Sequence, residues 1–287
     1  MNGVWLPEMF TSFAKNNAQV SEIKLEIIES PTKRAAVGRP LLFVHGAYAG
    51  AWCWQANFLP YFAGLGYHGF ALSLRGHGLS DGRAQLAATS ISDYACDVDV
   101  AVRRIEASTG LSPILIGHSM GGFVLQQYAR DHRVAGLALL ATVPPEGLIG
   151  SMLHLVWRHP QLMWELNLLQ QGGMPPHMDK LRELLFSPAL PDSLLLQYAA
   201  RFQHESDRAL IDMSLLQFDQ RPPLGQPPAL VLGCEDDKLM PSHLSHSAAR
   251  ALGVRAQMLG GVGHLLMLDA GWQIAADALA LWLASLP

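Results

Sequence analysis

The chain has 287 residues, of which 50% are hydrophobic, and it carries a formal net charge of −4 with no stripe of clustered Lys and Arg. This balance gives no reason to expect a nucleic-acid partner, and the length suits one large domain with an insertion or two small ones. Three cysteines, Cys53, Cys96 and Cys234, lie far apart and are odd in number, so they indicate neither a disulfide framework nor a metal site.

The N-terminal region has no recognisable targeting signal. Residues 1–20 lack a basic start followed by an apolar run, so we expect no signal peptide. The most apolar stretch, residues 134–143, is shorter than the roughly 18 residues that cross a bilayer, and it fits a core strand instead. Together with the cysteine pattern, these features predict a cytoplasmic protein without a transmembrane segment.

Short apolar runs that end in turns predict a series of strands alternating with helices. An edge strand is expected at 23–28, where polar and apolar residues alternate. The further predicted strands are 41–46, 69–78, 114–119, 136–143, 229–237 and 255–264, and the predicted helices are 52–65, 91–108, 123–131 and 242–252. This alternation predicts an α/β fold with a mostly parallel sheet, helices on both faces, and ligand sites at the carboxyl ends of the strands.

Residues 145–228 interrupt the alternation. The segment has no convincing strand, and it lies between two breakers, PPEG and RPPLGQPP. We therefore predict a helical cap over 145–228, inserted into a core domain formed by 1–144 and 229–287.

The conspicuous polar residues lie just after predicted strands. In ILIGHSMGGFV, Ser119 is placed at a strand-to-helix bend among three glycines, where we expect it to be exposed as a nucleophile. A helix cap or a phosphate-binding turn are the alternatives, but the Lys-Ser/Thr ending of a phosphate loop is missing. Asp237 and His264 follow later strands, in the order that a nucleophile elbow requires.

In this pattern the chain resembles the α/β-hydrolase superfamily. The motifs that carry the resemblance are HGAYAGAWCW, RGHGLSDG, GHSMGG, GCEDDKLMP and GVGHLLMLD, and they occur in the expected order over nearly the whole chain. The resemblance implies a serine nucleophile, Ser119, a base, His264, and an acid, Asp237. It assigns the oxyanion hole to the backbone amides of Met120 and Ala47.

The acid has two adjacent candidates. Counting forward from Gly233 along the family pattern selects Asp236, whereas counting back from Pro241 selects Asp237. Many relatives read GGEDD at this turn, and that alignment chooses Asp237 and leaves Asp236 to brace the turn. Glu146, after the preceding strand, is a distant third candidate because some relatives carry the acid there.

The remaining histidines are interpreted as structural. His45 and His118 are expected to support their turns by hydrogen bonds, and His77, with Arg75, to brace the turn after its strand. The histidines of HLSH (243–246) lack a third ligand, so no metal is predicted. His204 and Glu205 begin an HExx run that ends in Arg208, so the zinc-protease pattern fails.

The cap carries the candidate substrate pocket. Its apolar residues that we expect near Ser119 are Met152, Trp157, Met163, Trp164, Phe202 and Met213. They suggest a small-molecule substrate, an apolar carboxylic ester or a monoacyl lipid, cleaved without a cofactor. Thioester or carbon–carbon bond hydrolysis, a lyase, a haloperoxidase side activity, and a receptor-like relative with little turnover remain open.

Overall fold

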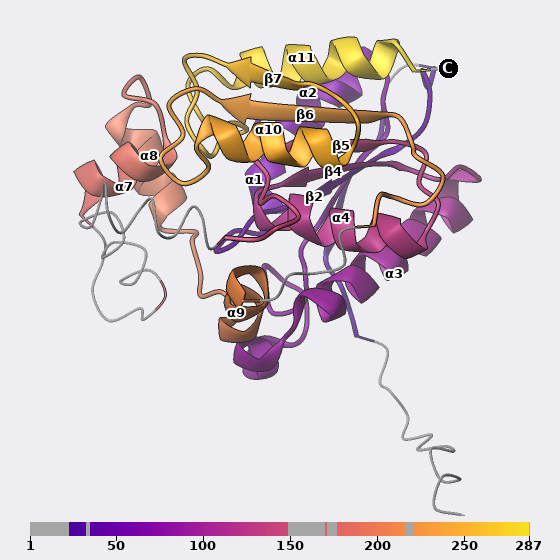
Figure 1. Cartoon of the computed structure of the whole chain (residues 1–287), viewed down its shortest axis with the longest axis horizontal. Helices are drawn as coiled ribbons and strands as arrows, with labels where there is room; N and C mark the ends of the chain where they lie inside the picture. The colour runs from indigo at the N-terminus through magenta and orange to yellow at the C-terminus, as the bar shows by residue number, and fades with distance from the viewer. Residues whose placement is uncertain (1–22, 33–34, 149–169, 171–176, 216–220, 287) are drawn as a thin grey trace, which may run out of the picture.

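The computed structural model describes residues 23–32, 35–148, 170, 177–215 and 221–286. In these residues seven strands form one sheet in the order β1-β3-β2-β4-β5-β6-β7 (Figure 1). The strands are β1 (Ile27–Ser30), β2 (Leu41–Val44), β3 (Gly69–Leu72), β4 (Ile114–His118), β5 (Leu137–Leu140), β6 (Ala229–Cys234) and β7 (Ala256–Leu259). Only β1 runs antiparallel to its neighbour; the other pairs in the described sheet are parallel.

Helices pack on both faces of this sheet. The described helices are α1 (Trp52–Gln55), α2 (Phe58–Leu65), α3 (Ile91–Thr109), α4 (Met120–Asp131), α7 (Met178–Leu185), α8 (Asp192–Ala199), α9 (Asp207–Leu215), α10 (Ser242–Ala251) and α11 (Trp272–Ala284), with a 3₁₀ turn at Arg83–Ala88. Of these, α7 and α8 lie beyond the ends of the strands rather than on a face of the sheet (Figure 1). The α/β fold that the sequence predicts, a mostly parallel sheet with helices on both faces, is therefore observed.

Alternation along the strands sends side chains into two cores. In β2, Leu41 and Phe43 join one apolar cluster with residues of α1, α2 and α11. Leu42 and Val44 point to the other face and join a cluster with residues of α3, α4 and α10. Because successive side chains of a strand point to opposite faces, a continuous apolar run is the pattern of a strand covered on both sides.

Several predicted boundaries were wrong by a few residues, and the strands predicted at 69–78, 229–237 and 255–264 end earlier, at Leu72, Cys234 and Leu259. The edge strand begins at Ile27, and before it the backbone of Lys24 bonds to Asp81 in the turn after β3. The predicted helix 52–65 is divided into α1 and α2 at Asn57, whose side-chain amide donates to the Met267 carbonyl. Helix α4 begins at Met120, directly after Ser119.

The described part of segment 145–228 is helical. Helices α7 and α8 contribute to the first apolar cluster through Leu181, Leu184 and Tyr198. Helix α9 contributes Ala209 and Met213 to the second cluster. No strand occurs among the described residues of this segment, and the division into a core and a cap stays a prediction.

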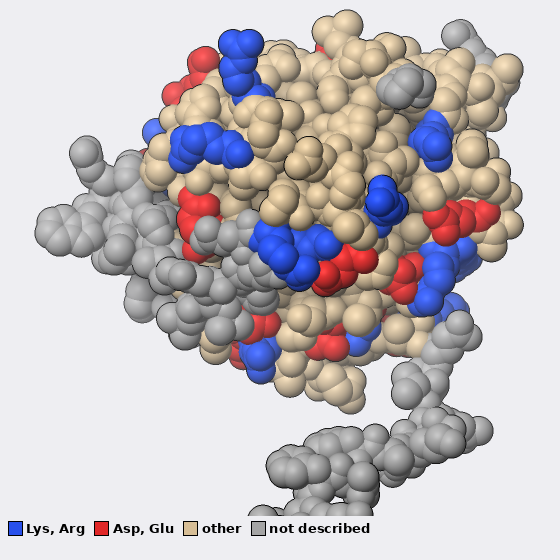
Figure 2. Space-filling view, turned by 45° about the vertical axis from the view of Figure 1, so that its right-hand side comes forward, with Lys and Arg blue, Asp and Glu red and all other residues tan. Residues whose placement is uncertain are grey.

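The surface carries both signs of charge. On the face in Figure 2, basic side chains are interspersed with acidic ones between larger neutral areas. Within the described ranges, no helix combines the length and apolar character needed to cross a membrane.

Strand order places the candidate site. From β2 the chain continues to β3 on one side, whereas β4 lies on the other side of β2 and is followed outward by β5. The turns after β2 and β4 therefore flank a topological switch point, the place where open α/β sheets bind ligands. Ala47 follows β2, and Ser119 follows β4.

Candidate active site

The turn between β4 and α4 holds Ser119 in a strained conformation. Its φ is 50° and its ψ is −119°, outside the regions that L-residues favour. Glycines allow the backbone segments around this turn to approach one another closely. A Cβ on Gly121 would lie 2.4 Å from the His45 carbonyl oxygen, and one on Gly117 would lie 2.7 Å from the Gly122 backbone. The turn presents Ser119 at the carboxyl edge of the sheet, with only 8% of its surface exposed. The expectation that Ser119 is exposed was wrong, because neighbouring loops close around it.

Ser119, His264 and Asp237 are brought together from three separate loops. The Ser119 Oγ lies 3.1 Å from His264 Nε2, and His264 Nδ1 lies 2.7 Å from Asp237 Oδ2. A carboxylate only accepts hydrogen bonds, so Nδ1–H donates to Asp237 and Nε2 is left to accept from the serine hydroxyl. This is the tautomer that a general base for Ser119 requires.

The acid loop distinguishes Asp237 from its neighbour. Asp237 is buried, and its second oxygen, Oδ1, accepts from Leu239 N and Met240 N, both at 2.8 Å. These bonds fix the carboxylate toward His264. Asp236 and Glu146 are both exposed. Of the three acid candidates, Asp237 is the one in contact with His264, as the alignment from Pro241 predicts.

The two amides proposed for an oxyanion hole belong to residues near Ser119. Met120 is the first residue of α4, so its N–H has no carbonyl acceptor one turn earlier in the helix. Ala47 lines the same small pocket as Ser119 and His264. The next amide, Tyr48 N, donates to Glu205 Oε2 at 3.3 Å and is therefore already engaged.

The described wall of the catalytic pocket is mostly apolar. The pocket has a volume of about 60 Å³. It is lined by Ala47, Tyr48, His118, Ser119, Leu185, Phe202, Leu239, His264 and Leu265. Of the predicted substrate residues, Phe202 lines this pocket, whereas Met213 is buried in the apolar cluster of α3 and α4. Met152, Trp157, Met163 and Trp164 lie outside the described residues.

Two histidines support the turns, as the sequence suggests. His118 Nε2 lies 2.9 Å from the His264 carbonyl oxygen and donates to it, which ties the nucleophile strand to the base loop. Burial, together with the nearby His264, holds the pKa of His118 well below its usual range, so this ring is neutral. His45 Nε2 accepts from Leu74 N at 3.0 Å and lies between the turns after β2 and β3.

Asp269 is a site residue that the sequence analysis missed. It is buried five residues after the proposed base, and its carboxylate accepts from Gly263 N at 2.8 Å, Ser187 N at 2.6 Å and Ser187 Oγ at 2.5 Å. These bonds join the His264 loop to the end of α7. The sequence signal that could have identified Asp269 is its position as an acidic residue at the end of the otherwise apolar run LLMLD.

Glu205 is the second missed residue. Its fully buried carboxylate lies 3.0 Å from His77 Nε2 and 2.6 Å from the Tyr94 hydroxyl. The failed HExx motif thus contains a buried carboxylate, and His77 contacts this carboxylate as well as bracing its own turn. In the sequence Glu205 was considered only as part of a zinc pattern. Among the described residues no group of three potential metal ligands gathers.

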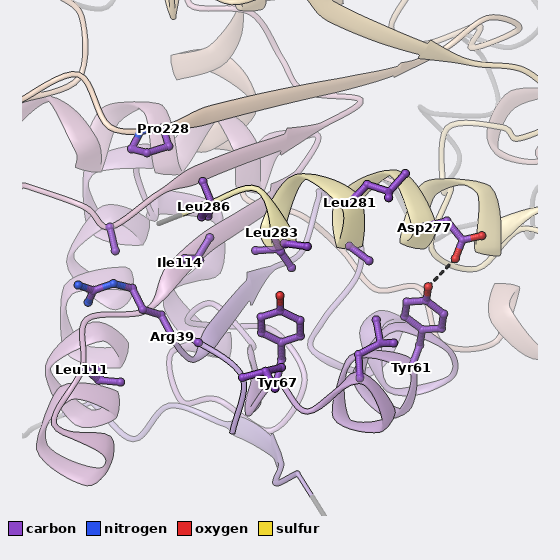
Figure 3. A pocket seen from close by; sticks show the side chains of 16 residues that line it. Arg39, Tyr61, Tyr67, Leu111, Ile114, Pro228, Asp277, Leu281, Leu283 and Leu286 are labelled. Atoms are coloured by element: carbon purple, nitrogen blue, oxygen red, sulfur yellow. Dashed lines mark hydrogen bonds between the residues drawn. The ribbon is translucent and has the colours of Figure 1, made fainter. Parts of the chain in front are cut away.

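A second hollow lies near the amino ends of the strands, opposite the end that carries Ser119 (Figure 3). It has a volume of about 1250 Å³ and is lined by residues that precede β2, β4 and β6, such as Arg39 and Pro228, and by α11 residues such as Leu281. Tyr67 stands at its centre, and Tyr61 bonds to Asp277 at one end. Among the described residues, this hollow and the pocket at Ser119 have no lining residue in common. Its greater size therefore carries no argument about where ester chemistry occurs.

The family follows from a comparison with known sequences. Residues 41–278 match the model of a family described as "Alpha/beta hydrolase family". The chain belongs to the α/β-hydrolase family. The match includes every strand from β2 to β7 and all three residues of the Ser119–His264–Asp237 chain. Membership supports a hydrolytic enzyme.

Relatives in this family include proteins named as esterases and as chloroperoxidases. The chain is 33% identical over 116 residues to the non-heme chloroperoxidase CPO-A1 of Kitasatospora aureofaciens, an alignment that covers 38% of each chain. It is 31% identical over 113 residues to the probable esterase PIR7A of Oryza sativa subsp. indica, covering 38% of this chain and 41% of the relative. The chain thus spans well under half the length of the curated relatives it matches.

Solved structures show the same architecture. A thermophilic esterase from Thermogutta terrifontis superposes with a TM-score of 0.70 at 20% identity, over 94% of this chain and 96% of the other. At this identity the likeness shows the fold alone.

Proposed function

We propose that this α/β-hydrolase is a serine esterase that cleaves apolar carboxylic esters with small acyl groups through an acyl-enzyme intermediate. The observation that carries the proposal is the continuous chain from Ser119 Oγ through His264 to Asp237, with contacts of 3.1 Å and 2.7 Å. A serine hydroxyl is a poor nucleophile unless a base takes its proton during attack, and this chain provides that base.

In the proposed reaction, Ser119 Oγ attacks the ester carbonyl carbon while its proton passes to His264 Nε2. The carbonyl oxygen becomes an oxyanion, which accepts hydrogen bonds from the amides of Ala47 and Met120. The imidazolium, stabilised by Asp237, then gives its proton to the departing alkoxide, which leaves as the alcohol. Water, deprotonated by His264, attacks the acyl-enzyme, and the carboxylic acid leaves as the Ser119 proton returns.

The pocket wall supports an apolar substrate with a small acyl group. Leu185, Phe202 and Leu239 line the pocket that contains Ser119, and this pocket has a volume of about 60 Å³. Apolar walls favour burial of hydrocarbon. Among the residues that the structure describes, the pocket lining contains no Lys or Arg that would bind a phosphate or a polycarboxylate.

The proposal is tested by covalent labelling and by burst kinetics. Incubation with a fluorophosphonate probe should label the wild-type chain once, and 4-nitrophenyl acetate should give a nitrophenolate burst of about one equivalent followed by turnover. The Ser119→Ala variant should give neither signal, with an unchanged circular dichroism spectrum. Binding of esters without a burst or turnover would instead support a receptor-like protein. A panel of matched oxygen esters and thioesters separates an esterase from a thioesterase.

A further inference from the structure

Residues 203–205 hold the loop after β2 from both sides. Gln203 N donates to the Tyr48 carbonyl at 3.0 Å, and Tyr48 N donates to Glu205 Oε2 at 3.3 Å. Tyr48 has a φ of 66°, a left-handed conformation that is uncommon for a bulky residue. Such a conformation persists only where surrounding contacts hold it. These two hydrogen bonds therefore help to define the path of the chain directly after Ala47.

The Glu205 carboxylate is fully buried and well supplied with donors. Besides Tyr48 N, it accepts from His77 Nε2 at 3.0 Å, from the Tyr94 hydroxyl at 2.6 Å and from Ser206 N at 2.7 Å. A carboxylate has about four acceptor sites, and all are used here. The donors come from the turn after β3, from α3 and from the loop after β2, so one side chain joins these elements to segment 145–228.

His77 is the positive partner of this carboxylate. Its Nε2 faces Glu205, and its Nδ1 lies 3.1 Å from the Arg75 carbonyl oxygen. Both neighbours are acceptors, so both ring nitrogens carry protons. Burial disfavours the charged ring, but the charge of Glu205 and these hydrogen bonds outweigh burial and raise the pKa of His77.

The other titratable groups around the pair fit this charge assignment. Burial and the charge of His77 lower the pKa of His45, whose ring centre lies 5.0 Å from that of His77, to about 3, so His45 is neutral. The Tyr94 hydroxyl is protonated because burial and Glu205 raise its pKa. Arg83 acts on His77 and Asp207 acts on Tyr48, both through longer-range electrostatic interactions.

We propose that Glu205 is a positioning residue for the oxyanion hole: paired with His77, it keeps the Tyr48 N–H engaged and so orients the preceding Ala47 amide toward the carbonyl oxygen of the substrate. The inference rests on the proposed esterase function. An unpaired carboxylate near Ala47 would oppose the developing oxyanion. The proton on His77 cancels that charge, so the carboxylate orients the loop without an electrostatic penalty.

This arrangement has a consequence for pH. When His77 loses its proton at alkaline pH, the buried Glu205 charge is left uncompensated beside the oxyanion hole. The value of kcat should then fall through the raised pKa of His77. With glutamine at position 205 no such charge remains, so this alkaline decrease should disappear.

The test compares Glu205→Gln with the control Glu183→Gln. Glu183 is on α7 in the same segment, and its half-exposed carboxylate pairs with Lys180. Rates on 4-nitrophenyl acetate are measured from pH 5.5 to 10, with active sites counted by complete fluorophosphonate labelling. We expect Glu205→Gln to lower kcat roughly 10- to 100-fold, somewhat less than direct removal of an oxyanion donor. KM should stay within about twofold because ground-state binding is unaffected. The control should match the wild type. The proposal would be overturned if the Glu205→Gln variant had the kcat of the wild type and still lost activity at alkaline pH.

A rescue experiment separates positioning from simple support of the fold. His77→Gln retains a side-chain donor but removes the positive charge, so kcat should fall further than in Glu205→Gln. The double variant His77→Gln/Glu205→Gln removes the uncompensated charge and should recover to the kcat of Glu205→Gln. A double variant no more active than His77→Gln contradicts the proposal.

A measurement on the unmodified protein covers the case in which these variants do not fold. In ¹⁵N-labelled wild type, the His77 imidazole should have both nitrogens protonated at pH 7. It should lose one proton over the pH range in which kcat decreases. A His77 ring that is neutral at pH 7 overturns the inference.

The outcome that would refute the esterase assignment differs from the one that would refute the role of Glu205. If wild-type Ser119 is not labelled, the proposed function is wrong, whereas a labelled, active wild type with an unaffected Glu205→Gln variant removes only the role of Glu205.

Discussion

Ser119 has a φ of 50° and its hydroxyl lies 3.1 Å from an imidazole that is itself bonded to a buried carboxylate. A relaxed helix cap would direct the serine oxygen toward its own helix, and no such cap bond forms here. The helix-cap alternative raised by the sequence therefore lacks the contact that defines it.

Asp237 provides a prediction at the scale of one residue. Asp237→Asn should lower kcat by about 10⁴-fold, because an amide no longer fixes the imidazole tautomer or stabilises the imidazolium. The exposed neighbour gives the control, since Asp236→Asn should stay within about twofold of the wild type. Steady-state kinetics on 4-nitrophenyl acetate measure both. The reverse order of losses would assign the acid to Asp236.

The choice between Asp236 and Asp237 shows how far sequence reasoning reaches at this scale. The pattern from Pro241 was sufficient, because the turn places one of two adjacent side chains inward and the other in solvent. The role of Glu205 could not be predicted from the sequence, because its partner His77 lies 128 residues away along the chain and no local spacing relates the two residues. Asp269 similarly contacts Ser187, which lies 82 residues away in the chain.

At the scale of the elements, the site depends on how closely α4 approaches β2. A Cβ on Gly121 would lie 2.4 Å from the His45 carbonyl oxygen and 2.5 Å from that of Val44, and backbone atoms on two packed elements have little freedom to move. The sequence predicted the sharp turn from its glycines, but it placed the start of the helix at Phe123 because glycine rarely opens a helix.

Gly121→Ala should therefore destabilise the chain by about 1–3 kcal/mol, as overpacking generally does. It should also reduce esterase activity, because Ser119 would be displaced. Gly64→Ala is the matched control, since nothing lies within 4 Å of a Cβ there. At this exposed position in the last turn of α2 the added methyl should stabilise by up to roughly 0.5–1 kcal/mol. Urea denaturation measures both, and equal stabilities would contradict the close-approach argument.

The loop after α8 supplies a second prediction at this scale. Phe202 is part of the described pocket wall, so Phe202→Ala should raise the relative kcat/KM for 4-nitrophenyl octanoate over acetate, by about tenfold. Leu196→Ala, at a 58% exposed position of α8, should leave the ratio unchanged. The ratio is read from a series of nitrophenyl esters. An equal loss on all chain lengths would mean that Phe202 only supports the loop.

At the scale of the whole molecule, the sheet could be predicted from the sequence, whereas the contacts between segment 145–228 and the rest of the chain could not. Apolar runs and their terminal turns are local features, so the parallel order of motifs was readable in advance. The Glu205–His77 pair, which links this segment to the core, depends on the tertiary arrangement. It should make stability depend on pH.

The sign of this dependence follows from the two pKa shifts. The pKa of His77 is raised above its ordinary 6.5, so its contribution is fully present below pH 6.5 and is lost as pH rises through the folded value. The pKa of Glu205 is lowered, because the charge of His77 and hydrogen bonds outweigh burial, so its contribution is present above its ordinary 4.5 and is lost as pH falls through the folded value.

The wild type should therefore exceed Glu205→Gln in Tm by the largest margin between about pH 4.5 and 6.5, where both groups contribute fully. Breaking a buried pair costs about 3–5 kcal/mol, so a difference of roughly 6 °C or more is expected there. Thermal denaturation across pH 4 to 10 follows the margin, which should narrow toward both ends. A margin that grows steadily toward alkaline pH would show that the pair is not charged.

The central claim is that Ser119 carries the acyl group during turnover. The most direct measurement is mass spectrometry of protein quenched in acid within milliseconds of mixing with 4-nitrophenyl acetate, followed by peptide mapping. We predict one added acetyl group, located on Ser119 in the wild type and absent in Ser119→Ala. Full turnover with no acetylated Ser119, or with the acetyl group on another residue, would contradict the account.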